Sequence, residues 1–156
     1  MSHSLTGKTI AVLMGGPGSE RAISLVSAKS VSQALRSLDG VTVIDVDVKH
    51  SDFELPPATD LAYNVIHGTF GEDGDLQAIL ESKGLPYTGA GLESSKLAFD
   101  KILTKDRLIE ARVSTPAYEY WRLKESAAPD MRIPMVVKPP REGSSVGVHI
   151  VQSPDE

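Results

Sequence analysis

Along the first part of the chain, stretches with the periodicity of strands alternate with stretches of helical periodicity. Residues 9–14 are a continuous apolar run, which is typical of a parallel strand buried on both faces. A helical period begins at Ser19 and ends before Asp39 and Gly40. Further strands are predicted at residues 41–48, 61–66 and 85–88, and a short helix at residues 75–83. This alternation implies right-handed crossovers and an open parallel sheet.

The pattern changes after about residue 95. A long helix, interrupted or not, is predicted from Ser94, and it carries five basic residues. Strands are predicted at residues 117–121, 133–138 and 148–151, with a polar loop between the first two. We therefore expect an α/β protein of two domains. Residues 1–95 form an open parallel-sheet domain, and residues 96–156 begin a mostly antiparallel one.

Composition removes several classes of protein. The chain has 156 residues, 40% apolar and 24% charged, which is ordinary for a globular protein and excludes disordered and coiled-coil classes. Its net charge of −5 has the wrong sign for a nucleic-acid-binding protein. Because cysteine is absent, disulfides, thiolate zinc sites and a cysteine nucleophile are excluded. No apolar run approaches the length of a membrane span, so we expect a cytoplasmic protein without membrane contact.

The first candidate site is the glycine turn that follows the first strand. Backbone N–H groups at the start of a helix attract anions, so residues 15–18 invite a nucleotide-binding interpretation. The glycine spacing differs from the dinucleotide-binding fingerprint, and Asp45 and Asp47 lie too far along the chain for its acidic residue. Glu20 either stabilises the helix start, by about 0.3–1 kcal/mol, or holds the ammonium group of a substrate.

A second candidate follows the third predicted strand, at residues 67–74. Three glycines there exceed what a simple strand-to-helix connection needs, and ligands of open α/β sheets bind beyond the carboxyl ends of the strands. His67 stands at that edge, which also carries Glu20, although a single histidine is more often structural. Glu72 and Asp73 are possible metal ligands, but turn formation and charge at the helix start explain them better.

The third candidate joins Lys138, at the end of an apolar strand, to a loop of two glycines and two serines at residues 141–147. A lysine charge with N–H and hydroxyl donors suits a phosphate. The loop lacks the Gly-Lys-Ser or Gly-Lys-Thr of a Walker sequence, so phosphates would be held under a hairpin lid. An exposed hairpin with a solvated lysine is an equally good interpretation.

Taken together, these motifs resemble those of D-alanine–D-alanine ligases, which have the ATP-grasp fold. The similarity covers almost the whole chain. It rests on Gly15, Gly16, Ser19, Glu20 and Ser24; on His67-Gly-x-x-Gly-Glu-Asp-Gly-x-Leu-Gln-Ala78; on Tyr87-Thr88-Gly89-x-Gly91; on Asp100-Lys101; and on Lys138-Pro-x-Arg-Glu-Gly-Ser-Ser-Val-Gly147. The first domain would then be the domain that precedes the ATP-grasp unit, and the second would be the start of that unit.

The resemblance implies ATP-dependent joining of two D-alanines for peptidoglycan precursors. The carboxylate of the first D-alanine takes a phosphoryl group from ATP, and the amine of the second attacks the acyl phosphate. Glu20 and Ser144 would act as catalytic residues that orient the first D-alanine, with His67 lining the same pocket. The nucleotide-binding residues implied are Lys101, Lys138, Glu142, Gly143 and Ser145.

The same resemblance places other parts of the active site beyond Glu156. In the family, the ligands of the Mg²⁺ or Mn²⁺ ion lie there, so we expect no metal ligand in this chain and no ligase activity from it alone. Members of the family usually pair through the first domain, which implies a homodimer. Two alternatives stay open: a non-catalytic dimerisation or regulatory module, and a ligase that takes D-lactate or D-serine as the second substrate.

Overall fold

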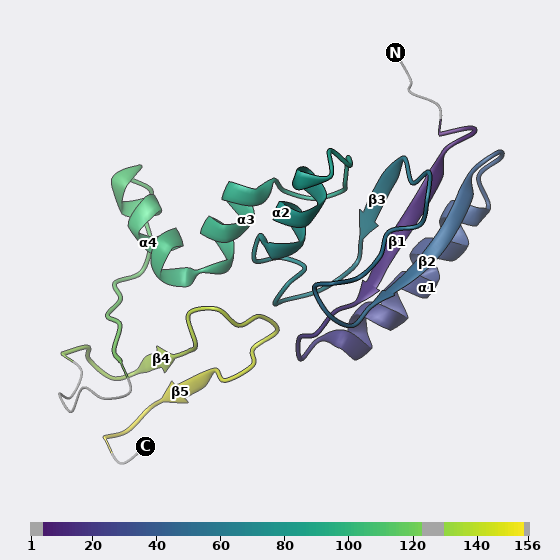
Figure 1. Cartoon of the computed structure of the whole chain (residues 1–156). Helices are drawn as coiled ribbons and strands as arrows, with labels where there is room; N and C mark the ends of the chain where they lie inside the picture. Colours follow the sequence, from purple (N-terminus) through teal and green to yellow (C-terminus); the bar gives the residue numbers. More distant parts are fainter. Residues whose placement is uncertain (1–4, 123–129, 155–156) are drawn as a thin grey trace. The chain divides into compact units, whose positions relative to one another are not determined.

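The computed structural model describes residues 5–122 and 130–154, and the chain divides into two compact units, Met1–Lys96 and Leu97–Glu156. The first unit is an α/β sandwich (Figure 1). Its elements are β1 (Thr9–Gly15), α1 (Arg21–Arg36), β2 (Thr42–Val48), β3 (Leu61–Asn64) and α2 (Asp75–Ser82), and α3 (Leu92–Phe99) follows them. None of the helices in the described ranges is long and apolar enough to cross a membrane.

The three strands form a parallel sheet, as the sequence predicted, and the structure gives their order as β2-β1-β3. Gly15 at the end of β1 lies opposite Val48 at the end of β2, so the carboxyl ends of the strands share one edge. The prediction of a strand at residues 85–88 is wrong. That segment forms a single parallel bridge, Ala62 to Tyr87, because Pro86 has no N–H to donate and Gly89 turns the chain at φ +112°.

Strand β1 is buried on both faces, as its apolar run predicted. Ala11 and Leu13 pack on the side that contains Leu76 and Leu80 of α2. On the opposite side, Val12 and Met14 pack with Ala28 of α1, as do the partly buried Leu25, Val31 and Leu35. The sheet is therefore covered by a helix on each face, which leaves its carboxyl edge as the place where loops gather.

Helix α1 begins at Arg21, two residues later than Ser19, and Glu20 occupies the N-cap position. Its most buried residues are Ser24, Ala28 and Ser32. Small side chains on this face let the helix approach the sheet closely. Leu38, which continues the apolar stripe in the sequence, lies beyond the end of the helix and is 44% exposed.

The long helix predicted from Ser94 is interrupted. Helix α3 ends at Phe99, and α4 spans Lys101–Glu110. Asp100 has extended backbone angles, and its carboxylate accepts hydrogen bonds from Ile102 N (2.9 Å) and Leu103 N (3.2 Å). An aspartate that caps one helix while ending another places a sharp boundary inside a stretch whose interruption the sequence left open.

The second unit also holds an antiparallel pair, β4 (Met135–Val137) and β5 (His149–Val151). No strand forms at residues 117–121, contrary to the prediction. Side chains of α4 hold that region: Lys105 Nζ donates to Pro116 O (2.6 Å), and Tyr118 donates its hydroxyl proton to Asp106. The polar loop predicted before residue 133 includes residues 123–129, which lie outside the described residues.

Candidate functional site

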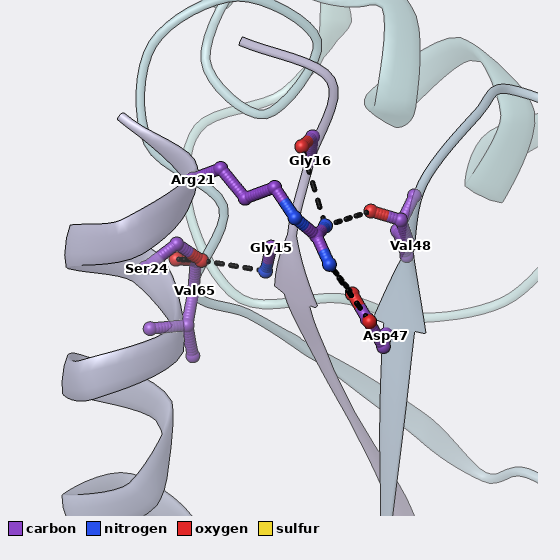
Figure 2. Close-up of polar contacts among 7 residues, drawn as sticks. All are labelled: Gly15, Gly16, Arg21, Ser24, Asp47, Val48 and Val65. Carbon is purple, nitrogen blue, oxygen red and sulfur yellow. Dashed lines mark hydrogen bonds and ion pairs between the residues drawn. The ribbon is translucent and has the colours of Figure 1, made fainter. Parts of the chain in front are cut away.

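The glycine turn between β1 and α1 is fixed to the neighbouring strands by hydrogen bonds (Figure 2). Gly15 N donates to Ser24 Oγ (2.9 Å), and this hydroxyl donates to Val65 O (2.6 Å). Gly16 N donates to Val48 O (2.8 Å). Gly15 and Gly16 have φ values of +85° and +87°, a conformation that only glycine adopts without strain. The turn is therefore a rigid connection and not a flexible loop.

Glu20 lies where the turn meets the loop that follows β3. Its side chain makes no cap hydrogen bond with α1. A Cβ atom added to Gly68 would lie 3.0 Å from Glu20 Oε1, and one added to Gly18 would lie 3.3 Å from Thr69 O. The structure thus brings the Glu20 carboxylate against the loop that begins at His67. Glycine at both contact points permits this close approach.

The loop at residues 67–74 is held in a strained shape by the side chains around it. Phe70 is buried with φ +77°, which is a genuine outlier for a bulky residue. Asp73 Oδ2 accepts a hydrogen bond from Phe70 N (2.8 Å), while Asn64 Nδ2 and Gln77 Nε2 both donate to Gly71 O. Asp73 is thus a turn former, as the sequence favoured.

His67 combines a partly exposed ring with one buried nitrogen. Its side chain is 33% exposed, and Nδ1 lies 3.8 Å from Glu72 Oε1. Nε2 is buried without a hydrogen-bond partner among the described residues. Because a buried polar nitrogen without a partner is costly, this atom suits a ligand group better than a purely structural role. No group of three His, Asp or Glu residues in the described ranges is arranged to hold a metal ion.

In the second unit, the start of α4 is tied to the serine-containing loop. Lys101 Nζ donates to Glu142 O (2.6 Å), and Lys101 N donates to Pro140 O (2.9 Å). Arg141 Nε donates to Asp100 Oδ2 (2.8 Å). Burial raises the pKa of Asp100, but hydrogen bonds from Arg141 and from two backbone amides outweigh it, and the pKa lies below its ordinary value. The implied phosphate ligand Lys101 therefore already contacts the loop.

The loop itself is strained at both serines. Ser144 and Ser145 have φ values of +47° and +62°, and each left-handed residue costs about 1–2 kcal/mol. Such strain is concentrated at functional sites. Lys138 is exposed just after β4, and Gly143 O accepts a hydrogen bond from Val146 N (2.9 Å). Glu20 belongs to the first unit and Ser144 to the second, so the network between them stays a prediction.

The supporting contacts of these sites were not predicted from the sequence, although Gln77, Asp100 and Arg141 belong to the motifs named above. Arg21, Asn64 and Gln77 hold the two loops of the first unit, and Asp100 and Arg141 hold the loop of the second. Arg21 and Asp100 bind partners 26 and 41 residues away, so spacing carries no sign of those pairs. Asn64 and Gln77 bind a nearer partner, Gly71, but neither contact follows from periodicity.

Comparison with known proteins agrees with this geometry. Residues 45–90 match the family model described as D-ala D-ala ligase N-terminus. The chain is 43% identical over 157 residues to the D-alanine–D-alanine ligase of Geotalea uraniireducens, covering 97% of this chain and 50% of that protein. It is 42% identical to the ligase of Methylacidiphilum infernorum, covering 91% and 46%. The chain matches the amino-terminal half of D-alanine–D-alanine ligases. It spans about half the length of the curated relatives it matches.

Solved structures of this family have the same fold. The D-alanine–D-alanine ligase of Bacillus anthracis superposes with a TM-score of 0.79 at 33% identity, covering 95% of this chain and 50% of that one. D-alanyl-alanine synthetase A of Vibrio cholerae gives 0.78 at 31% identity, covering 97% and 54%. The resemblance stated from the motifs is confirmed, and so is the fold class of a parallel α/β unit followed by an antiparallel one.

Proposed function

We propose that this chain supplies the substrate pocket and part of the nucleotide site of a D-alanine–D-alanine ligase. The reaction is ATP-dependent ligation of two D-alanines through an acyl phosphate, for peptidoglycan precursors. The observation that carries the proposal is the Glu20 carboxylate beside the His67 loop, at the sheet edge where α/β proteins bind ligands. The relatives named above, which share about 42–43% of their residues with this chain, are D-alanine–D-alanine ligases.

In the pocket, Glu20 accepts hydrogen bonds from the ammonium group of the first D-alanine, and Ser144 completes the network that orients it. His67 lines the pocket, and its buried Nε2 gives the site a polar atom that can face the substrate. These residues act by orientation and charge, because holding reactants in place lowers the barrier without a covalent intermediate on the enzyme.

For ATP, the proposed residues are Lys101, Lys138, Glu142, Gly143 and Ser145. Support comes from the strained serine loop beside Lys101 and from a Bacillus anthracis relative whose crystal structure is complexed with ATP. To bind a phosphate oxygen, Lys101 Nζ exchanges its hydrogen bond to Glu142 O for one to the nucleotide. When bound, Mg²⁺ or Mn²⁺ neutralises charge on the phosphates, and its ligands belong to the half of the ligase that this chain does not match.

We also propose that the chain forms a homodimer through its first unit. Helix α1 exposes two large apolar side chains one turn apart, Ile23 (59% exposed) and Val26 (66% exposed). Apolar side chains this exposed suit a contact between subunits. Analytical sedimentation of the chain tests this proposal. The wild type is expected to be a dimer, and the double substitution Ile23→Ser and Val26→Ser is expected to convert it to a monomer. A wild-type monomer at high concentration would contradict it.

The ligase proposal is tested by phosphate release with ATP, Mg²⁺ and D-alanine. Alone, the chain is expected to give no turnover. Fused to the unmatched half of the Geotalea uraniireducens ligase, it is expected to turn over at about 1–1,000 per second, as ordinary enzymes do. Glu20→Gln in the fusion should abolish most activity, whereas Glu54→Gln, at an exposed carboxylate of the same unit, should not. A folded but inactive fusion would contradict the proposal and favour the non-catalytic module.

A further inference from the structure

Arg21 links three segments at the edge that carries Glu20. Its Nη2 contacts both carboxylate oxygens of Asp47, at 2.7 and 2.8 Å. Its Nη1 donates to Val48 O (3.1 Å) and lies 3.5 Å from Gly16 O. Figure 2 shows the guanidinium reaching from the start of α1 to the end of β2 and to the glycine turn. Arg21 is only 33% exposed, and its bidentate ion pair has the geometry of strong pairs.

The glycine turn is shaped around this guanidinium. A Cβ atom added to Gly15 would lie 2.3 Å from Arg21 Nη1 and 2.6 Å from Asp47 Oδ1. Any other residue at position 15 would displace the ion pair. The same glycine donates its N–H to Ser24 one turn along the helix. Arg21 and Ser24 therefore hold the first turn of α1 from two sides.

This arrangement replaces the usual helix cap. The N-cap residue of α1 is Glu20, whose side chain makes no cap hydrogen bond, and the first turn contains no acidic residue. Helix starts are ordinarily fixed by a Ser, Thr, Asp or Asn at this position. Here the contacts of the next residue, Arg21, fix the start, which leaves the N-cap position to a carboxylate that lies beside Gly68.

We propose that Arg21, paired with Asp47, is a positioning residue that holds the Glu20 carboxylate against the loop at Gly68. The pairing has an electrostatic consequence as well, because Asp47 balances the guanidinium charge close to a site meant for an ammonium group. That Glu20 receives the ammonium of D-alanine rests on the proposed function; the positioning itself does not.

The test is an NMR pH titration of the whole chain without ligand, following the Gly68 amide through the range in which carboxylates ionise. Glu20→Gln identifies the part of the response that belongs to Glu20 and separates it from His67 and Glu72. In Arg21→Met that part should fall to about half or less, because the effect of a charge weakens with distance. In Arg21→Lys, the part of the response that belongs to Glu20 should lie between its values in the wild type and in Arg21→Met.

The matched control is Arg36→Met. Arg36 pairs with Asp45 at 2.9 Å, again from α1 to β2, but at the far end of the helix. The Arg36→Met substitution should leave the pH response of the Gly68 amide unchanged. The proposal would be overturned if a folded Arg21→Met chain kept the full pH-dependent shift of the Gly68 amide. It would also be overturned if Glu20→Gln left the wild-type shift of that amide unchanged. If Arg21→Met does not fold, Asp47→Asn decides by the same criterion.

Addition of D-alanine to the wild-type chain separates this inference from the proposed function. Shifts of the Gly68 amide on adding D-alanine support binding at Glu20. Absence of such shifts, together with the ligand-free response described above, contradicts D-alanine binding by this chain and leaves the positioning by Arg21 intact.

Discussion

Replacing Ser24 by alanine should destabilise the first unit far more than the same change at Ser32. Both serines lie on the buried face of α1, at 0% and 1% exposure. Ser24 Oγ accepts a hydrogen bond from Gly15 N and donates one to Val65 O, and both hydrogen bonds are buried. Ser32 Oγ donates to Asp45 Oδ1 (2.6 Å), whose side chain is 42% exposed and also pairs with Arg36.

The difference follows from what each substitution leaves behind. Ser24→Ala strands one donor and one acceptor in the interior, at about 1–3 kcal/mol each. Ser32→Ala leaves a carboxylate that water and Arg36 still satisfy, so one net hydrogen bond of about 0.5–1.5 kcal/mol is lost. Alanine gains helix propensity in both cases, and this gain of about 0.5 kcal/mol cancels in the comparison. We expect Ser24→Ala to lower the free energy of unfolding by about 1.5–5.5 kcal/mol and Ser32→Ala by about 0–1 kcal/mol.

The assay is urea unfolding followed by circular dichroism, with amide hydrogen exchange of β1 reporting on the first unit alone. Trp121, which lies in the second unit, gives an independent fluorescence control that neither substitution should change. Equal losses in the two variants would refute the argument, because they would mean that the hydrogen bonds of Ser24 do not fix the turn.

Three further outcomes are expected. Asp100→Ala should destabilise the second unit by about 1 kcal/mol, because a helix cap is lost. Since the pKa of Asp100 is lowered in the folded state, its stabilising contribution is present at neutral pH and is lost as the pH falls through that lower pKa. The urea midpoints of the variant and the wild type, followed by Trp fluorescence, should therefore differ at pH 7 and converge in acid. Gly84→Ala, at φ +63° in open space, should cost about 1–2 kcal/mol, and Gly16→Ala more, since its Cβ would also lie 2.4 Å from a neighbouring side chain; thermal melts give both. Burial and Glu81 raise the pKa of Tyr87 to about 12, so an alkaline absorbance titration should lose that ionisation in Tyr87→Phe and show it at lower pH in Glu81→Gln.

The interruption between α3 and α4 illustrates why some boundaries escaped the sequence. Apolar periodicity continues through Asp100, and periodicity was the basis of the predicted long helix. An aspartate in that position is compatible with an exposed helical residue or with a cap. In the structure it is a cap, and Arg141, which follows it by 41 residues, donates to the second oxygen of its carboxylate. The absent strand at residues 117–121 has a similar cause, since contacts with α4 replace a strand ladder.

The sequence alone determined the parallel sheet, the helices that cover it and the family, because these depend on local periodicity and on motifs that are contiguous in the chain. It also placed Glu20 and His67 at one edge, since parallel strands end together. Only the tertiary structure decided how those residues are held. The pairs Arg21 with Asp47 and Ser24 with Val65 join segments 26 and 41 residues apart. Such contacts arise when the strands pair, so no local pattern encodes them.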